Sequence, residues 1–338
     1  MPAPSADPDR SSALIAGFQA QRILVIGDLM LDEFLWGKVS RISPEAPVPV
    51  VDVTAESYYP GGAANVARNV REFTPRVAVM GLAGRDSAGE RLVELLERAQ
   101  IDTSAVLRDP AYSTTVKTRI IARHQQVVRV DRERKAPLPA GQAETAVRLL
   151  DRAIAEMDAI VVADYGKGFL TQAFADHICR AARAHGKILT VDPHPHTSLR
   201  WRGATVVKPN RAEAFLAAAL PPTDPVEPVL SDAALLGAGK RLLETWEAGS
   251  VLITLGEQGM LLLRSGSPPH HTPARAQEVF DVSGAGDTAI AVLTLALAAG
   301  ATPAEAAEMA NCAGGIVVGK VGTATVTAAE LRAACGAV

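Results

Sequence analysis

The stretch RILVIGD, residues 22–28, is a short apolar run that ends in Gly-Asp. A run that is apolar on both faces is typical of a buried strand in a parallel sheet. Similar runs recur at residues 76–84, 159–166, 187–193, 204–210 and 250–259. Helical patterns lie between them, at residues 61–73, 87–100, 141–157, 171–186 and 231–249. This alternation predicts a doubly wound α/β fold, with a mostly parallel sheet flanked by helices.

Several of these runs end in residues suited to binding. They end at Asp28, Asp164, Asp192, Asn210 and Gly256. Ligands of doubly wound folds bind beyond the carboxyl ends of the parallel strands. We therefore expect a functional site at this edge of the sheet.

Composition narrows the possible partners. The chain has 338 residues, is 48% hydrophobic and carries a formal net charge of −3. It has no basic stripe of the kind that binds nucleic acid and no polybasic tail for a membrane surface. The most apolar segment, residues 289–299, is shorter than the roughly 20 residues that span a bilayer. We expect small-molecule ligands, with neither nucleic acid nor membrane as a partner.

The cysteines and the N-terminus favour a cytoplasmic protein. Cys179, Cys312 and Cys335 are far apart and show no metal-ligand spacing, which fits a reducing compartment. The first 20 residues lack the basic and apolar regions of a signal peptide. We interpret residues 1–20 as an N-terminal extension and residues 21–338 as one domain.

Two stretches, residues 34–59 and 111–131, break the alternation and predict a small β-sheet lid over the strand ends. Alternate residues of a strand share a face, so Lys117, Arg119 and Arg123 are expected to point one way, with Arg129 on the returning strand. Such a basic face suits an anionic substrate. The alternative is an edge strand that carries charges against aggregation.

The motif SGAGD, residues 283–287, precedes an apolar helix. Gly284, Ala285 and Gly286 leave their amides open at the positive end of that helix, which makes them a candidate anion hole. Asp287 at its edge could take a proton from an attacking hydroxyl. The alternative is a plain helix N-cap, a position at which Asp is favoured.

Three further motifs accompany this turn. GDLMLD contains Asp28 and Asp32, PGGAANVARN contains a glycine pair and Asn65, and KPNRAE contains Asn210 and Glu213. The segment GAGKRL, residues 237–242, is not a phosphate loop, because it lies in a helical pattern and lacks Ser or Thr after the lysine. No G-x-S-x-G elbow supports a serine hydrolase.

Together the four motifs resemble the ribokinase-like (PfkB) family of ATP-dependent carbohydrate kinases, from about residue 22 to residue 331. The resemblance implies that Asp287 is the catalytic base and that Gly284, Ala285 and Gly286 form the anion hole. It implies sugar contacts at Asp28, Asp32, Gly61, Gly62 and Asn65. It implies nucleotide contacts at Asn210, Glu213, Gly256, Gly259 and Asn311. The cofactors implied are ATP and Mg²⁺, with Glu213 near the metal, and the lid is expected to form a homodimer interface.

A narrower resemblance is to the D-glycero-β-D-manno-heptose 7-phosphate kinases, which serve lipopolysaccharide core synthesis. It rests on SRISPEAPVPVV (40–51), RHQQVVRVD (123–131), DYGKG (164–168) and GKVGTATV (319–326). The chain is then expected to be a stand-alone kinase that phosphorylates the anomeric hydroxyl. A cationic clamp for the substrate phosphate is expected from Lys117, Arg119, Arg123, Arg129 and Lys167.

One departure from the family pattern and two alternatives remain open. After the strand at 187–193, relatives carry Lys-Gly where this chain has His194 and His196, and loop histidines are commoner than metal ligands. The first alternative is another sugar, sugar-phosphate or nucleoside kinase of the same fold. The second is a non-catalytic regulator that binds a sugar phosphate, against which the intact Asp287, Asn210 and Glu213 argue.

Overall fold

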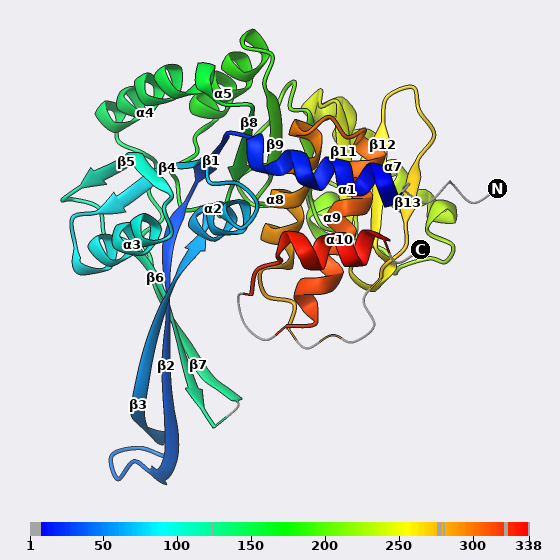
Figure 1. Cartoon of the computed structure of the whole chain (residues 1–338). Helices are drawn as coiled ribbons and strands as arrows, with labels where there is room; N and C mark the ends of the chain where they lie inside the picture. The colour runs from blue at the N-terminus through cyan, green and yellow to red at the C-terminus, as the bar shows by residue number, and fades with distance from the viewer. Residues whose placement is uncertain (1–7, 124, 276–278, 280, 321–323, 337–338) are drawn as a thin grey trace.

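The main layer of the computed structural model, which describes residues 8–123, 125–275, 279, 281–320 and 324–336, is a nine-stranded sheet. The strand order is β13-β12-β11-β10-β9-β8-β1-β4-β5 (Figure 1). The parallel strands are β1 (Ile23–Gly27), β4 (Val77–Gly84), β5 (Asp102–Asp109), β8 (Ala159–Ala163), β9 (Ile188–Asp192), β10 (Val206–Val207) and β11 (Ser250–Thr254). At one edge, β12 (Met260–Arg264) and β13 (His270–Thr272) continue the sheet antiparallel. The predicted doubly wound fold is confirmed.

Helices cover both faces of this sheet, and the strands are apolar on both sides for that reason. On β1, Ile23 and Val25 pack into one core, whereas Leu24 and Ile26 pack into the other. The first core is covered by α1 (Pro8–Gly17), α2 (Ala63–Arg71), α3 (Ser87–Arg98), α8 (Ala285–Ala298), α9 (Pro303–Val318) and α10 (Ala328–Gly336). The second is covered by α4 (Ala140–Ala153), α5 (Gln172–Ala184), α6 (Arg211–Ala217) and α7 (Ala233–Trp246).

Helix α8 is the central helix of the first face. Its residues from Thr288 to Leu297 are all buried. No side of this segment faces solvent, which explains why its sequence is Ala- and Leu-rich on every side. The helix begins after Gly284, whose φ of 81° lies in the left-handed region that glycine adopts readily. Its N-terminus lies at the carboxyl ends of β8 and β9, because Asp287 in its first turn contacts Tyr165 in the loop after β8 and Gly286 lies beside Asp192 at the end of β9.

A second, four-stranded sheet has the order β3-β2-β6-β7. Its strands are β2 (Leu29–Ile42), β3 (Pro49–Gly62), β6 (Thr115–Ala122) and β7 (Gln125–Arg132). Two antiparallel hairpins are joined by parallel pairing of β2 with β6. In Figure 1 the hairpin of β2 and β3 projects away from the main body. Both stretches predicted to form a small β-sheet lie here, and we refer to this sheet as the lid.

The prediction that Arg123 shares a strand face with Lys117 and Arg119 is wrong. Strand β6 ends at Ala122, and Arg123 follows it with a φ of 60°. The register also shifts between Ile120 and Ile121, which breaks the alternation. Arg123 instead lies beside Trp36 and Gly37, where its amide donates to the Gly37 carbonyl (3.2 Å).

Neither the helices nor the cysteines of the described residues indicate a membrane span or a disulfide. Within the described ranges, every helix is too short or too polar to cross a lipid bilayer. Cys179, Cys312 and Cys335 are all buried and free.

Gly27 is required by the close approach of β1 to β8. A Cβ at this position would lie 2.0 Å from the carbonyl oxygen of Ala163. We expect Gly27→Ala to lower the free energy of unfolding by about 1–3 kcal/mol, because backbone must move to relieve the overlap. Urea denaturation followed by circular dichroism measures the change.

Gly141→Ala is the matched control. A Cβ there meets no atom within 4 Å, and the residue lies in the first turn of α4. Its unfolding free energy should stay within about 1 kcal/mol of the parent value. Equal stabilities for the two variants would contradict the packing argument.

Candidate active site

Asp287 is held by two hydrogen bonds at the N-terminus of α8. The Tyr165 hydroxyl donates to Oδ1 (2.6 Å), and Asn65 Nδ2 donates to Oδ2 (2.6 Å). Burial raises the pKa of Asp287 to about 6, although both hydrogen bonds favour the charged form. A carboxylate whose pKa lies just below neutral pH is suited to accept a proton.

Asp28 binds three backbone amides of one loop. Its carboxylate is buried and accepts hydrogen bonds from the amides of Tyr165 (3.0 Å), Lys167 (3.1 Å) and Phe169 (3.1 Å). Three of the roughly four acceptor positions of the carboxylate are thus occupied by one loop. Asp28 therefore anchors the loop that follows β8, and its expected contact with a sugar stays a prediction.

Asp32 and the glycine pair lie together at the base of the lid. A Cβ on Gly61 would lie 2.5 Å from Asp32 Oδ2, and a Cβ on Gly62 would lie 2.6 Å from the Asp28 carbonyl. Gly62 also has a φ of 60°, and it forms the N-cap of α2. The glycines therefore let β3 run close to β2 and start α2, and α2 in turn carries Asn65 toward Asp287.

Asn65 has one polar atom to spare. Its Nδ2 is bonded to Asp287, whereas its buried Oδ1 has no hydrogen-bond partner among the described residues. A buried acceptor without a donor is costly unless a ligand satisfies it. The position therefore suits a hydroxyl of a bound substrate beside the candidate base.

A cavity of about 410 Å³ lies on the other side of the Gly284–Gly286 turn. It is lined by Gly256, Gly259, Ala285, Gly286 and Asn311, together with residues of α9 and the β12 edge. The structure thus brings together five residues that were predicted separately. Within the turn, the Ala285 amide already donates to the Val282 carbonyl (3.3 Å), so Gly284 and Gly286 are the better candidates for the anion hole.

Sequence reasoning missed an ion pair directly beneath this turn. Lys208 Nζ lies 3.1 Å from Asp192 Oδ2, and both lie next to Gly286, where a Cβ would be 3.6 Å from Nζ. Lys208 is only 3% exposed. Lys208 could have been predicted from its position directly before Pro209 and Asn210, because the resemblance already implied that Asn210 contacts the nucleotide.

Asn210 and Glu213 form a reciprocal capping box at the start of α6. Asn210 Oδ1 accepts from the Glu213 amide (2.9 Å), and Glu213 Oε2 accepts from the Asn210 amide (2.7 Å). Burial and the nearby Asp192 both raise the pKa of Glu213. Asn210 pairs through its backbone with Thr254, which lines the cavity, so the two residues lie at the cavity's edge.

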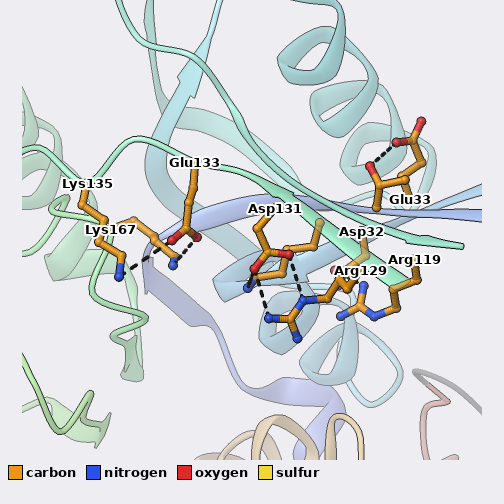
Figure 2. A network of polar contacts seen from close by, with 10 residues as sticks. Asp32, Glu33, Arg119, Arg129, Asp131, Glu133, Lys135 and Lys167 are labelled. Carbon is orange, nitrogen blue, oxygen red and sulfur yellow. Dashed lines mark hydrogen bonds and ion pairs between the residues drawn. The ribbon is translucent and has the colours of Figure 1, made fainter. Parts of the chain in front are cut away.

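Four of the five basic residues predicted to hold a phosphate are paired with acids, as Figure 2 shows. Arg119 contacts Asp32 (2.5 Å), and Arg129 and Lys117 both contact Asp131 (2.8 and 3.4 Å). Lys167, from the loop after β8, meets Glu133 (2.5 Å), which also faces Lys135 (3.7 Å). The structure brings together the predicted Lys117, Arg119, Arg129 and Lys167, but not Arg123. Asp131 and Glu133 were missed, although they alternate with the basic residues in RVDRER.

His194 and His196 lie in the loop after β9, with ring centroids 5.6 Å apart. His194 packs on Gly166, where a Cβ would be 2.9 Å from Nδ1. No cluster of three or more potential ligands (His, Cys, Asp or Glu) occurs in the part of the chain that the structure describes. His194 thus packs against the loop that Asp28 anchors.

Curated proteins similar to this chain bear one shared description. The chain is 44% identical over 316 residues to "Bifunctional protein HldE" of Desulfatibacillum aliphaticivorans, a match that covers 94% of this chain and 63% of that protein. It is 46% identical over 331 residues to the protein of the same description from Caulobacter vibrioides, covering 96% and 65%. The chain thus spans less than two thirds of the length of these relatives.

Solved structures share the fold at low sequence identity. The Arabidopsis thaliana ribokinase complexed with ribose and ATP has a TM-score of 0.70 at 15% identity, covering 93% of this chain and 98% of that one. Phosphofructokinase-2 from Escherichia coli, in complex with potassium, has a TM-score of 0.73 at 21% identity, with the same coverage. A family model described as "pfkB family carbohydrate kinase" matches residues 20–330. The chain belongs to the pfkB family of carbohydrate kinases.

Proposed function

We propose that this chain transfers the γ-phosphoryl group of ATP to the anomeric hydroxyl of D-glycero-β-D-manno-heptose 7-phosphate, giving the 1,7-bisphosphate. The family membership supports an ATP-dependent sugar kinase. The observation that carries the proposal is the position of Asp287, which directly follows Gly286 at the cavity and is held by Asn65 and Tyr165. The sugar itself is inferred from the resemblance of the sequence to heptose 7-phosphate kinases.

In the proposed reaction Asp287 accepts the proton of the attacking hydroxyl. Each of its oxygens receives one hydrogen bond, so a second acceptor position on each oxygen remains for substrate. Asn65 Oδ1, which has no hydrogen-bond partner in the described part of the chain, would accept a hydrogen bond from a neighbouring sugar hydroxyl. General-base assistance of this kind contributes about 10²–10⁴-fold to the rate.

The cavity beside Gly286 is the proposed ATP site. The amides of Gly284 and Gly286 and the ammonium of Lys208 would stabilise the charge of the transferring phosphoryl group. Asp192 and Glu213 are neighbouring carboxylates, the oxygen ligands that suit Mg²⁺ bound to nucleotide phosphates. Mg²⁺ bound there would neutralise phosphate charge, and the Asn210–Glu213 capping box fixes the Glu213 carboxylate.

The charge of the lid supports a phosphorylated sugar. The ion-pair network contains six cations, Lys117, Arg119, Arg129, Arg132, Lys135 and Lys167, and four carboxylates, Asp32, Glu33, Asp131 and Glu133. Six minus four leaves an excess of two positive charges. A sugar phosphate dianion would balance this excess, whereas a neutral sugar would not.

The lid also supports a homodimer, which we propose forms through this sheet. Strand β7 is exposed along its whole length, and Val53, Val128 and Val130 are each more than 40% exposed. A thin sheet with apolar residues in solvent is stabilised when a second layer covers it. A second copy of the chain is the proposed layer.

The cytoplasmic location expected from the cysteine pattern remains a prediction.

Asp287→Asn is the direct test of the base. The substitution is isosteric, so the fold should persist, and kcat should fall by about 10²–10⁴-fold because amide nitrogen and oxygen are poor bases. In the parent enzyme kcat/KM should decline below about pH 6, as Asp287 becomes protonated. A coupled ADP-release assay measures both. Parent-like turnover by Asp287→Asn would refute the proposed mechanism.

A substrate panel tests the sugar. In the same assay we expect the highest kcat/KM with heptose 7-phosphate, and a value at least about 10²-fold lower for the heptose without its phosphate, since charged hydrogen bonds are lost. Activity on fructose 6-phosphate or ribose, with none on heptose 7-phosphate, would identify another sugar kinase. Binding of the sugar phosphate without ATP consumption would favour a regulator.

The dimer is tested by paired charge substitutions on β7. Val128→Lys together with Val130→Lys should convert a dimer into a monomer in sedimentation velocity, because the lysines would be buried in the proposed interface. Val226→Lys, at a similarly exposed valine in the loop before α7, is the control and should leave the mass unchanged. A parent protein that sediments as a monomer would contradict the proposal.

A further inference from the structure

Tyr165 reaches the candidate base from a loop that sequence reasoning did not connect with it. The loop follows β8, and the Tyr165 hydroxyl donates to Asp287 Oδ1 at 2.6 Å. Asn65 Nδ2 binds the other oxygen at the same distance. The carboxylate is therefore fixed from two sides by groups that come from different elements.

The tyrosine itself is held in place by a buried anchor. Asp28, 3% exposed at the end of β1, accepts from the amides of Tyr165, Lys167 and Phe169. Asp164 adds two bonds within the same region, from the Gly166 amide (2.9 Å) and the Thr197 hydroxyl (2.6 Å). The loop therefore has little freedom to move Tyr165 away from Asp287.

Asn65 is fixed by a second, independent set of contacts. Asn69 Nδ2 donates to the Asn65 carbonyl (2.9 Å), and the Thr288 hydroxyl donates to Asn69 Oδ1 (2.8 Å). Asn69 and Thr288 are both buried, and Thr288 directly follows Asp287. Helices α2 and α8 are thus locked together next to the base, so that loss of the Tyr165 contact alone would leave Asn65 in position.

We propose that Tyr165 is a positioning residue for Asp287, which directs the carboxylate and stabilises its charged form through one hydrogen bond. The inference rests on the proposed role of Asp287 as base. Burial and the charge of Asp287 raise the pKa of Tyr165 well above its ordinary value, so the phenol remains a donor throughout the working range. A tyrosine that stays protonated can hold the base without competing for the substrate proton.

The other charged groups around the pair act in both directions. Asp192, on β9, raises the pKa of Asp287, and Lys208 lowers it. Asp192 and Asp32 face Tyr165 as well and oppose its ionisation. Because these groups remain in a Tyr165 variant, a change in the titration of Asp287 reports the missing hydroxyl.

Tyr165→Phe keeps the ring and removes the hydrogen bond. The acid limb of the kcat/KM profile should move to higher pH by about one unit, because a hydrogen bond to a charged group is lost. At pH 6 the variant should be slower than the parent by about fivefold, the deficit should approach about tenfold at lower pH and shrink as pH rises, and KM for ATP should not change. An acid limb that coincides with that of the parent would overturn the inference.

Tyr58→Phe is the matched control, since the Tyr58 hydroxyl also donates to a carboxylate, that of Glu56 (2.7 Å), on the exposed lid strand β3. Its pH profile should match the parent. A titration without substrate separates this inference from the proposed function: the ¹³C carboxyl signal of Asp287, assigned by its absence in Asp287→Asn, should titrate at higher pH in Tyr165→Phe. An unchanged titration refutes the role of Tyr165, whatever reaction the protein catalyses.

Discussion

The geometry of the site depends on one buried carboxylate that does not take part in the proposed chemistry. Asp28 directly follows β1, the strand that pairs with β4 and β8. Its carboxylate accepts hydrogen bonds from three amides of the loop after β8. Burial raises its pKa, and the amide hydrogen bonds oppose that rise. With its charge satisfied by backbone donors, Asp28 fixes both Tyr165 and Lys167. One of these contacts the candidate base and the other joins the charged network of the lid.

The strands of the main sheet and the motifs at their ends could be predicted from the sequence, because a strand buried on both faces must be a continuous apolar run. Strand β5 escaped prediction since it lies at the sheet edge, where most of its residues are partly exposed and the apolar run is broken. The β12–β13 extension was missed because it is a short antiparallel addition rather than another strand–helix unit. The predicted face of Arg123 was wrong for a local reason, because a register shift after Ile120 and the left-handed backbone of Arg123 itself end the alternation.

Within the site, the motifs could be predicted from the sequence, but most contacts between their side chains could not. The GAGD turn, the glycine pair and Asn65 were found as separate motifs, and the fold brings them to one point. The partners of the cations could not be predicted in the same way. Glu133 reaches Lys167 because the segment after β7 runs beside the loop that follows β8 (Figure 2). Arg129 and Asp131, in contrast, lie two residues apart on β7 and share a face of that strand. The pairing of Lys167 with Glu133 depends on the path of a loop, which no local pattern encodes, whereas the alternation of Arg129 and Asp131 was present in the sequence.

The paired state of the lid cations bears on how a substrate would be selected. Arg129 and Asp131 are both partly exposed, and such ion pairs contribute little net stability, typically about 0–1 kcal/mol. A phosphate dianion offers more acceptors than one carboxylate, so in the proposed complex it would replace Asp131 at Arg129 at small cost. The buried pair of Arg119 with Asp32 is different, because separating it would leave a carboxylate that is only 8% exposed without its partner. The exposed cations are therefore free to exchange partners, while Arg119 and Asp32 keep the base of the lid fixed beside Gly61.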